Sequence, residues 1–142
     1  MNPDDVRAAV LAVVHYIDAR QWKELKELFA PKVAVDYTSL FGGVASQTNA
    51  SELVGGWRAA LDGVVTQHLL GPIDVRLTRA GADAECHVRA LHYRAGASGG
   101  EAWEVLGHYV FVLALDGGAW RITKMKLETY HQQGNCALLS AK

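Results

Sequence analysis

The stretch that decides the fold is AWEVLGHYVFVLALDGGAWRITKMKLETY, residues 102–130. Residues 102–115 are almost uniformly apolar and rich in aromatic and β-branched side chains, which favours a long strand. The Asp116-Gly117-Gly118 sequence that follows predicts a tight hairpin turn. Residues 119–130 then predict the partner strand, so this stretch specifies a long antiparallel hairpin.

Strands are also predicted immediately before this hairpin. Residues 73–78 alternate apolar and polar side chains, as in a strand with one buried face. After a turn at residues 81–83, residues 84–94 predict a second long strand, and the glycine-rich segment 95–100 is typical of a connecting loop. The second half of the chain is therefore expected to form an antiparallel sheet.

The first half of the chain is mostly helical in pattern. Residues 3–18 place valine and isoleucine at helical spacing. A shorter helix is predicted over residues 22–29 with its end at Pro31, residues 33–40 predict a strand, and residues 49–61 predict a third helix. Three helices followed by antiparallel strands are typical of an α+β domain.

Length and charge exclude several classes of protein. A chain of 142 residues predicts a single domain, residues 1–142. With 14 basic and 15 acidic residues there is no basic surplus for nucleic acid, and no apolar stretch approaches the ~18 residues of a membrane span. The N-terminus lacks the basic flank of a signal peptide, and Cys86 and Cys136 lie far apart, so we expect reduced thiols and a cytoplasmic location.

Residues 102–115 are apolar on both faces of the predicted strand. One face carries Trp103, Val105, Tyr109, Phe111 and Leu113, and the other carries Leu106, Val110, Val112 and Ala114. An antiparallel sheet with one face in water would alternate with polar residues. We therefore expect one face to pack on the helices and the other on a second copy of the chain, which predicts a homo-oligomer.

Asp18 and His68 are the first candidates for chemistry. Asp18 is aligned with the apolar stripe of the first helix, and a carboxylate there needs a partner because burial of a lone charge is unfavourable. It is either a helix-end residue that caps the next turn or the partner of a histidine. His68 lies in an apolar extended segment, residues 64–71, where it is either a satisfied core residue or that partner. An Asp–His pair fixes the imidazole tautomer and suits a general base.

Further polar side chains are predicted to face a cavity. His92 is the polar exception on a strand face otherwise formed by Ala84, Cys86, Val88 and Ala90. Tyr37 is a second candidate. His108 is a third, and we expect it to point inward beside Leu106 and Val110. Each of the three is alternatively a core polar group with a local partner.

Several segments of the chain resemble a known family. Residues 16–22 (YIDARQW) and 35–37 (VDY) resemble the opening of the SnoaL-like branch of the nuclear transport factor 2-like (NTF2-like) superfamily. Residues 66–71 (TQHLLG) and 116–122 (DGGAWRI) continue the match, which covers about residues 5–130. Scytalone dehydratase is the nearest characterised enzyme that the chain resembles. The resemblance implies a cone-shaped, curved, mostly antiparallel sheet wrapped around N-terminal helices, the cystatin-like or NTF2-like α+β barrel, with a pocket inside.

The resemblance also assigns roles to individual residues. The catalytic aspartate and the central histidine of the dehydratase fall on Asp18 and His68, and a second active-site histidine falls on His92. One of its two substrate-polarising tyrosines falls on Tyr37. The rest of its polar ring is altered, and falls on Ile17 (with Tyr16 adjacent), Leu106 and His108.

These assignments imply a small lyase of dehydratase type. His68, oriented by Asp18, would remove a proton beside an activating carbonyl, and Tyr37 would stabilise the developing oxyanion. His92 or His108 would protonate the leaving hydroxyl. The expected apolar wall for an aromatic or polycyclic substrate consists of Leu40, Leu53, Trp57, Leu106 and Val110.

Other functions stay open at this point. The same fold serves non-catalytic ligand-binding and assembly modules, ketosteroid isomerases and polyketide cyclases, and relatives form dimers and trimers. No organic cofactor is implied, and no metal is expected because His15 and Asp18 alone make a weak metal pair. The C-terminal segment, residues 132–139, is expected to cover the mouth of the pocket.

Overall fold

The structure, a computed structural model, describes residues 2–141. The elements in chain order are α1 (Pro3–Asp18), α2 (Trp22–Glu27), β1 (Phe29–Asp36), α3 (Thr38–Phe41), β2 (Ser46–Asn49), α4 (Ala50–Ala60), β3 (Val65–Leu70), β4 (Asp74–Leu77), β5 (Ala82–Tyr93), β6 (Ala102–Asp116), β7 (Ala119–Gly134) and a 3₁₀ helix (Leu138–Ser140). No helix within the described residues is long and apolar enough to cross a membrane.

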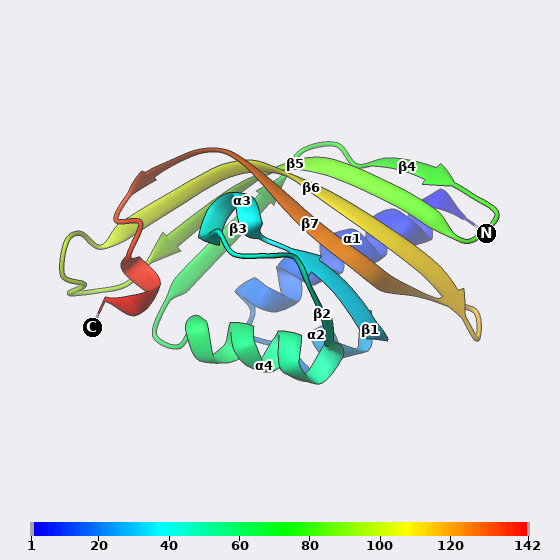
Figure 1. Ribbon diagram of the computed structural model, residues 1–142, viewed down its shortest axis with the longest axis horizontal. Coiled ribbons are helices and arrows are strands. Elements are labelled where there is room, and N and C mark those ends of the chain that lie inside the picture. The colour runs from blue at the N-terminus through cyan, green and yellow to red at the C-terminus, as the bar shows by residue number, and fades with distance from the viewer. Residues whose placement is uncertain (1, 142) are drawn as a thin grey trace.

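The seven strands form one curved sheet in the order β2-β1-β7-β6-β5-β3, with β4 paired to β5. Neighbouring strands are antiparallel except β1 and β7, which are parallel. Figure 1 shows the long strands β5, β6 and β7 arching over the helices. The expected α+β fold is confirmed, with the difference that the sheet stays open between β2 and β3 and does not close into a barrel.

Helix α1 forms the centre of the helical layer. The Asn2 side chain accepts a hydrogen bond from the Asp4 backbone N–H at 2.9 Å, and Pro3 occupies a first-turn position that needs no N–H donor. The apolar stripe predicted from the sequence is buried and consists of Val6, Val10, Val13, Val14 and Ile17. This packing places the C-terminal end of α1, with Asp18, on the concave side of the sheet.

The segment after α2 differs from the sequence prediction. Strand β1 already begins at Phe29, and Pro31 lies inside it, where the pairing with β7 is irregular and a missing N–H is tolerated. The Asp36 carboxylate accepts hydrogen bonds from the Thr38 backbone N–H at 3.0 Å and the Thr38 hydroxyl at 2.7 Å, which turns the chain into α3. Leu40 is therefore a helical residue and not a strand residue.

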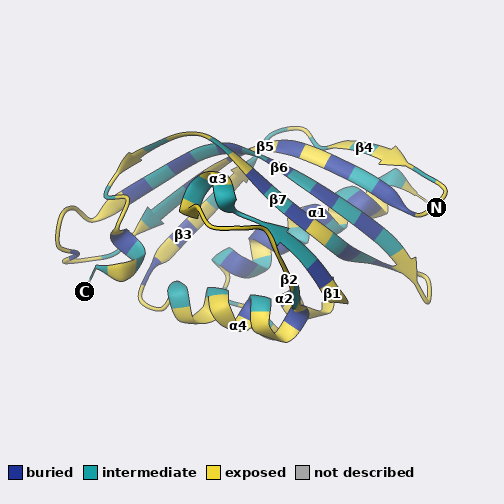
Figure 2. Ribbon diagram, in the orientation of Figure 1, coloured by how far each residue is buried: buried dark blue, intermediate teal, exposed yellow. Residues whose placement is uncertain are grey.

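The central hairpin forms as its sequence predicts. Gly117 and Gly118 both have positive φ, 57° and 85°, as the preferred two-residue hairpin turn requires. Burial alternates along both strands, as the striped colouring in Figure 2 shows. In β6 the inner face consists of Trp103, Val105, Gly107, Tyr109, Phe111 and Leu113.

This alternation corrects one prediction about β6. Leu106, His108 and Val110 lie at the intermediate positions of the strand, on the outer face of the sheet. The prediction that His108 points inward beside Leu106 and Val110 is wrong. Both faces of β6 are apolar, so hydrophobicity alone did not distinguish the inner face from the outer one.

Candidate active site

A cavity of about 130 Å³ lies on the concave side of the sheet. Its walls come from α1, α3, α4, β3, β5, β6 and the C-terminal 3₁₀ helix. Apart from two histidines and two tyrosines the lining is apolar, and consists of Ile17, Tyr37, Leu40, Phe41, Trp57, Ala60, Leu61, His68, His92, Trp103, Tyr109 and Leu139.

Asp18 and His68 meet at one wall of this cavity. Asp18 ends α1, and His68 lies in the middle of β3. The Asp18 Oδ1 atom is 2.7 Å from His68 Nδ1, and the Asp18 Oδ2 atom accepts a hydrogen bond from the His68 backbone N–H at 2.8 Å. The sequence allowed two roles for Asp18, a helix-end cap or the partner of a histidine, and the structure shows the second.

Hydrogen bonding keeps the Asp18 carboxyl ionised. Burial alone would raise its pKa, but hydrogen bonds from the His68 side chain, the His68 backbone and the Thr66 hydroxyl outweigh burial and lower the pKa. The ionised carboxylate can only accept, so His68 Nδ1 carries the proton and donates it. Within residues 2–141 no group hydrogen-bonds to His68 Nε2, which therefore offers a free lone pair on the cavity side.

Arg20 supports this arrangement from behind. Its Nη1 atom donates to the Thr66 hydroxyl at 3.1 Å and to the Ile17 carbonyl at 2.8 Å, and its Nη2 atom donates to the Val64 carbonyl. Arginine only donates, so the single Thr66 hydroxyl proton is directed to Asp18 Oδ1, 2.9 Å away.

The sequence analysis did not predict Arg20 as part of the site. In the structure its backbone conformation is unusual. Arg20 has a φ of 60°, which is unusual for a residue other than glycine. A residue in this conformation just after a helix is usually glycine. An arginine there indicates that its side chain has a structural task.

His92 lies beside His68, on the neighbouring strand β5. Its Nδ1 atom lies 3.1 Å from the Trp103 carbonyl oxygen, its ring stacks on Trp103 at 4.4 Å, and the two histidine ring centroids are 6.1 Å apart. Burial is the main cause that lowers the His92 pKa to about 4, so the ring is neutral at pH 7. The carbonyl can only accept, so Nδ1 holds the proton and Nε2 is an acceptor. This tautomer has no Nε2 proton for a leaving hydroxyl, contrary to the donor role expected from the resemblance.

Two tyrosines supply hydroxyl donors to the same cavity. Burial raises the pKa of Tyr37 well above its usual value, and the neighbouring Tyr109 raises it further. Burial likewise raises the pKa of Tyr109. Both phenols keep their protons at neutral pH. The Tyr37 hydroxyl donates to Met125 Sδ at 3.8 Å, a weak acceptor that a substrate oxygen can replace. Tyr109 was not predicted as a site residue, because the opposite face of this strand, with Leu106, His108 and Val110, was expected to point inward.

The structure separates the predicted site residues into three groups: those at the cavity, those packed in the core, and those on the outer face of the sheet. Those that line the cavity are Tyr37, Leu40, Trp57, His68 and His92, with Asp18 directly behind His68. Tyr16 and Leu53 pack against the core from α1 and α4 without lining the cavity. The C-terminal segment contributes Leu139 to the wall, next to the fully buried Leu138, whereas residues 132–134 belong to β7.

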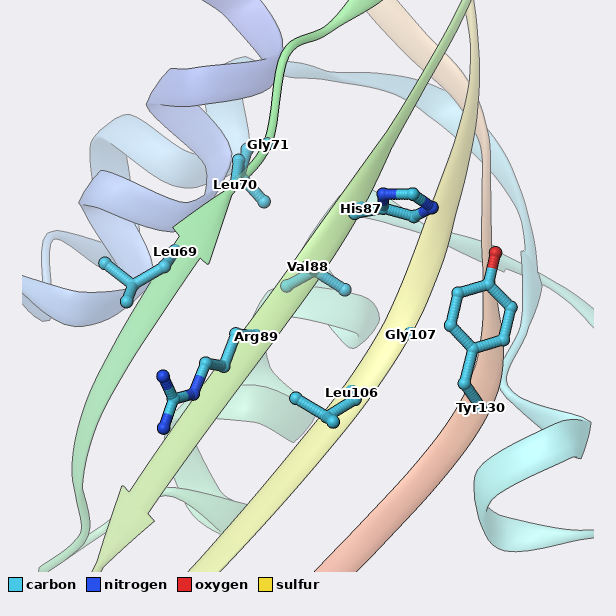
Figure 3. A pocket seen from close by; sticks show the side chains of 9 residues that line it. All are labelled: Leu69, Leu70, Gly71, His87, Val88, Arg89, Leu106, Gly107 and Tyr130. Atoms are coloured by element: carbon cyan, nitrogen blue, oxygen red, sulfur yellow. The ribbon is translucent and has the colours of Figure 1, made fainter.

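The remaining predicted residues lie on the outer face of the sheet. Figure 3 shows Leu106 in a hollow there, beside His87, Arg89 and Tyr130. His108 Nε2 lies 3.8 Å from Glu85 Oε2, also on this face. Leu106, His108 and Val110 therefore cannot contact a substrate held in the cavity that His68 and His92 line. Burial alternates along β6, and this alternation shows that their assignment as cavity residues is wrong.

Other catalytic chemistries find no support in the described part of the chain. Within residues 2–141 no three His, Cys, Asp or Glu side chains are grouped as a metal ion requires. Burial, and then the charge of Glu85, raise the pKa of the Cys86 thiol to about 11, which makes it a poor nucleophile. Cys136 is an exposed free thiol.

Comparisons with known proteins agree with this fold. The profile of a family described as "SnoaL-like domain" matches residues 3–126. A solved structure of the Kfla4162 protein from Kribbella flavida superposes with a TM-score of 0.84 at 23% identity, covering 95% of this chain and 97% of that chain. A search of the curated proteins found no significant match.

Two solved structures that are described as proposed dehydratases are also similar. A proposed scytalone dehydratase from Novosphingobium aromaticivorans has a TM-score of 0.79 at 16% identity, covering 92% of this chain and 85% of that chain. A proposed NTF2-like dehydratase from Streptomyces avermitilis has a TM-score of 0.71 at 15% identity, covering 88% and 93%. At these identities the likeness shows the fold alone. The family match over residues 3–126 shows that the chain belongs to the SnoaL-like family.

Proposed function

We propose that the protein is a cofactor-independent lyase of dehydratase type, with His68 as its general base and Asp18 as the group that orients it. The observation that carries this proposal is the 2.7 Å contact between Asp18 Oδ1 and His68 Nδ1, which leaves Nε2 free at the cavity. The similarity to proposed dehydratases supports the same class of reaction.

The proposed reaction is loss of water from a β-hydroxy ketone. His68 Nε2 removes a proton from the carbon beside the carbonyl, and the electron pair of that C–H bond moves toward the carbonyl oxygen. Tyr37 and Tyr109 donate hydrogen bonds to this oxygen as it gains charge. The C–O bond to the leaving hydroxyl then breaks, and the proton held by His68 joins it. The products are an unsaturated ketone and one water molecule, and the enzyme returns to its starting state.

The test is a screen of β-hydroxy ketones, followed by the His68→Ala variant on any compound that reacts. We expect kcat/KM to fall by about 10²–10⁴-fold, the usual contribution of a positioned base. The control is His15→Ala, which removes an exposed histidine of α1 outside the cavity. Full activity in the His68→Ala variant would exclude this mechanism.

An isomerase is a second candidate, and the tautomer of His92 favours it. His92 has no Nε2 proton, so His68 is the cavity histidine that can both take a proton and return it. Returning the proton to a second carbon gives an isomer and needs no leaving group. Product analysis separates the two reactions, because only the dehydratase releases water. A ligand-binding module without catalysis would bind ligand without turnover.

We also propose that the chain forms a homo-oligomer, a dimer or a trimer, in the cytoplasm. The outer face of the sheet carries apolar residues that include Leu106, Val110 and Val112, and Leu69 and Tyr130 are exposed on strands of the same sheet. Exposed apolar side chains gathered on one sheet face often mark an interface. Two free thiols are consistent with a reducing compartment.

A further inference from the structure

We infer that Arg20 is a positioning residue that holds the Asp18–His68 pair in the form in which His68 can accept a proton. Its positive charge acts on the pair through the Thr66 hydroxyl, without contact with the substrate. The inference rests on the proposed function for the role of His68. It adds the group that determines the pH range in which this base is available.

The contact between Asp18 and His68 has an unfavourable side for a general base. Asp18 Oδ1 lies 2.7 Å from His68 Nδ1, and the carboxylate is ionised. A negative charge at this distance stabilises the doubly protonated imidazolium as well as the correct tautomer. An imidazolium has no lone pair for a substrate proton. A positive charge that offsets this attraction therefore widens the pH range in which His68 is a base.

Arg20 supplies such a charge through one hydroxyl group. Its Nη1 atom donates to the Thr66 hydroxyl at 3.1 Å, and this hydroxyl donates at 2.9 Å to Asp18 Oδ1, the oxygen that also faces His68 Nδ1. Within residues 2–141 the ion pair of Asp18 is with His68 and not with Arg20. A cationic donor polarises the Thr66 O–H bond and so strengthens its hydrogen bond to the carboxylate.

Arg20 is the cation among the titratable groups around His68. His92 is neutral at pH 7, and the cavity phenols keep their protons. Burial is the main cause of the lowered His92 pKa, and the charge of Arg20 adds to it, so this charge reaches the cavity histidines. The complete set of groups is Asp18 at the end of α1, Arg20 after it, His92 on β5, and Tyr37 and Tyr109 in the cavity wall.

The backbone and the side chain of Arg20 both keep the charge in place. Its φ of 60° turns the chain back after α1, and its guanidinium donates to the Ile17 carbonyl at 2.8 Å and to the Val64 carbonyl. The guanidinium also lies 5.7 Å from the centre of the Trp22 ring, a favourable cation–π contact. A side chain held from several sides is fixed beside the Asp18–His68 pair.

Removal of the charge tests this role. In Arg20→Gln, we expect the midpoint of the His68 ¹⁵N titration, followed by NMR, to rise by about 0.5–1 pH unit, the usual scale of charge effects in proteins. The acid limb of the kcat/KM profile should move by the same amount. Arg20→Lys keeps the charge and should retain the wild-type midpoint. The control is Arg58→Gln, which removes an exposed positive charge of α4 outside the cavity and should leave the midpoint unchanged.

Three results would overturn the inference. The first is an unchanged midpoint in Arg20→Gln, and the second is an equal rise in Arg58→Gln. The third is a rise in Arg20→Lys as large as that in Arg20→Gln, which would show that the hydrogen bonds of Arg20 matter and its charge does not.

Thr66 provides an independent variant if Arg20→Gln does not fold. Thr66→Val keeps the shape of the side chain but removes the hydroxyl between Arg20 and Asp18, so the His68 midpoint should rise. Thr66→Ser keeps the hydroxyl and should retain the wild-type midpoint, and equal midpoints in the two variants would contradict the inference. The NMR readout needs no turnover. Loss of activity in His68→Ala together with an unmoved midpoint in Arg20→Gln would therefore refute this inference and leave the proposed function intact.

Discussion

Replacing Asp18 with asparagine should lower kcat/KM by about 10²–10⁴-fold while the chain stays folded. An asparagine can present its NH₂ group to His68 Nδ1, and the imidazole then carries its proton on Nε2. In that tautomer the atom that faces the cavity can no longer accept a proton. The loss should appear mainly in kcat, because the apolar walls that hold the substrate are unchanged.

Two measurements make this prediction specific. The control variant is Asp83→Asn, which removes a surface carboxylate that pairs with Arg76 and should leave kcat/KM unchanged. The ¹⁵N signals of His68 give a second readout that needs no substrate, since they should show a protonated Nδ1 in the wild type and a protonated Nε2 in Asp18→Asn. An unchanged tautomer together with full activity would rule out Asp18 as the orienting group.

The hydrogen-bonded groups behind His68 explain why the carboxylate is held so firmly. Asp18 accepts from the His68 ring, the His68 backbone and the Thr66 hydroxyl, and Arg20 fixes the orientation of that hydroxyl. A carboxylate with three donors stays ionised and immobile, which is the condition for a well-oriented base. The site is thus built from the end of α1 and from residues 66 and 68 of β3, two rigid elements far apart in sequence.

The parts of the site that follow from the sequence are those with a clear periodicity. Along β5, small apolar residues on the inner face alternate with exposed residues on the outer face. The face on which His92 lies could therefore be predicted from the sequence, and with it the place of His92 at the cavity. Asp18 stood out because it falls on the stripe of α1 that is otherwise apolar. In both cases a single polar residue interrupts a regular apolar pattern.

Strand β6 shows the opposite case. Its two faces are both apolar, so a shift by one residue leaves the hydrophobic pattern unchanged. The assignment of Leu106 and Val110 to the cavity failed for this reason, and Tyr109 was left out of the site. Which face of such a strand points inward is determined by its neighbours, here by pairing with β5 and β7 along its whole length.

Short elements with polar sequences were also missed. Strand β2 has the sequence Ser-Gln-Thr-Asn and forms because it pairs with β1 at the edge of the sheet, an interaction that local sequence does not encode. Helix α3 depends on the Asp36 side chain, which captures the backbone of Thr38. Helix α3 follows β1 directly and carries Leu40 and Phe41 into the cavity wall, and β2 follows α3.

Lowering the pH from about 6.5 to about 4 should destabilise the protein through His92. The folded state lowers the pKa of His92 from 6.5 to about 4, chiefly by burial. Below pH 6.5 the unfolded chain therefore binds a proton that the folded chain still excludes, so stability falls as the pH falls. The shift corresponds to at most about 3 kcal/mol, fully lost near pH 4, and to less where water reaches the ring.

The variant His92→Phe isolates this contribution. Phenylalanine keeps the stacking surface toward Trp103 but cannot titrate, so the urea midpoint should depend much less on pH between 6.5 and 4 than in the wild type. His87→Phe, an exposed residue on the outer side of β5, should retain the wild-type slope. Asp18 affects stability in a separate pH range. Its pKa is lower in the folded chain than the ordinary value of 3.8, so its contribution to stability is lost only below that pH. Equal slopes in His92→Phe and the wild type would show that His92 titrates alike in both states, which would contradict a pKa lowered by burial.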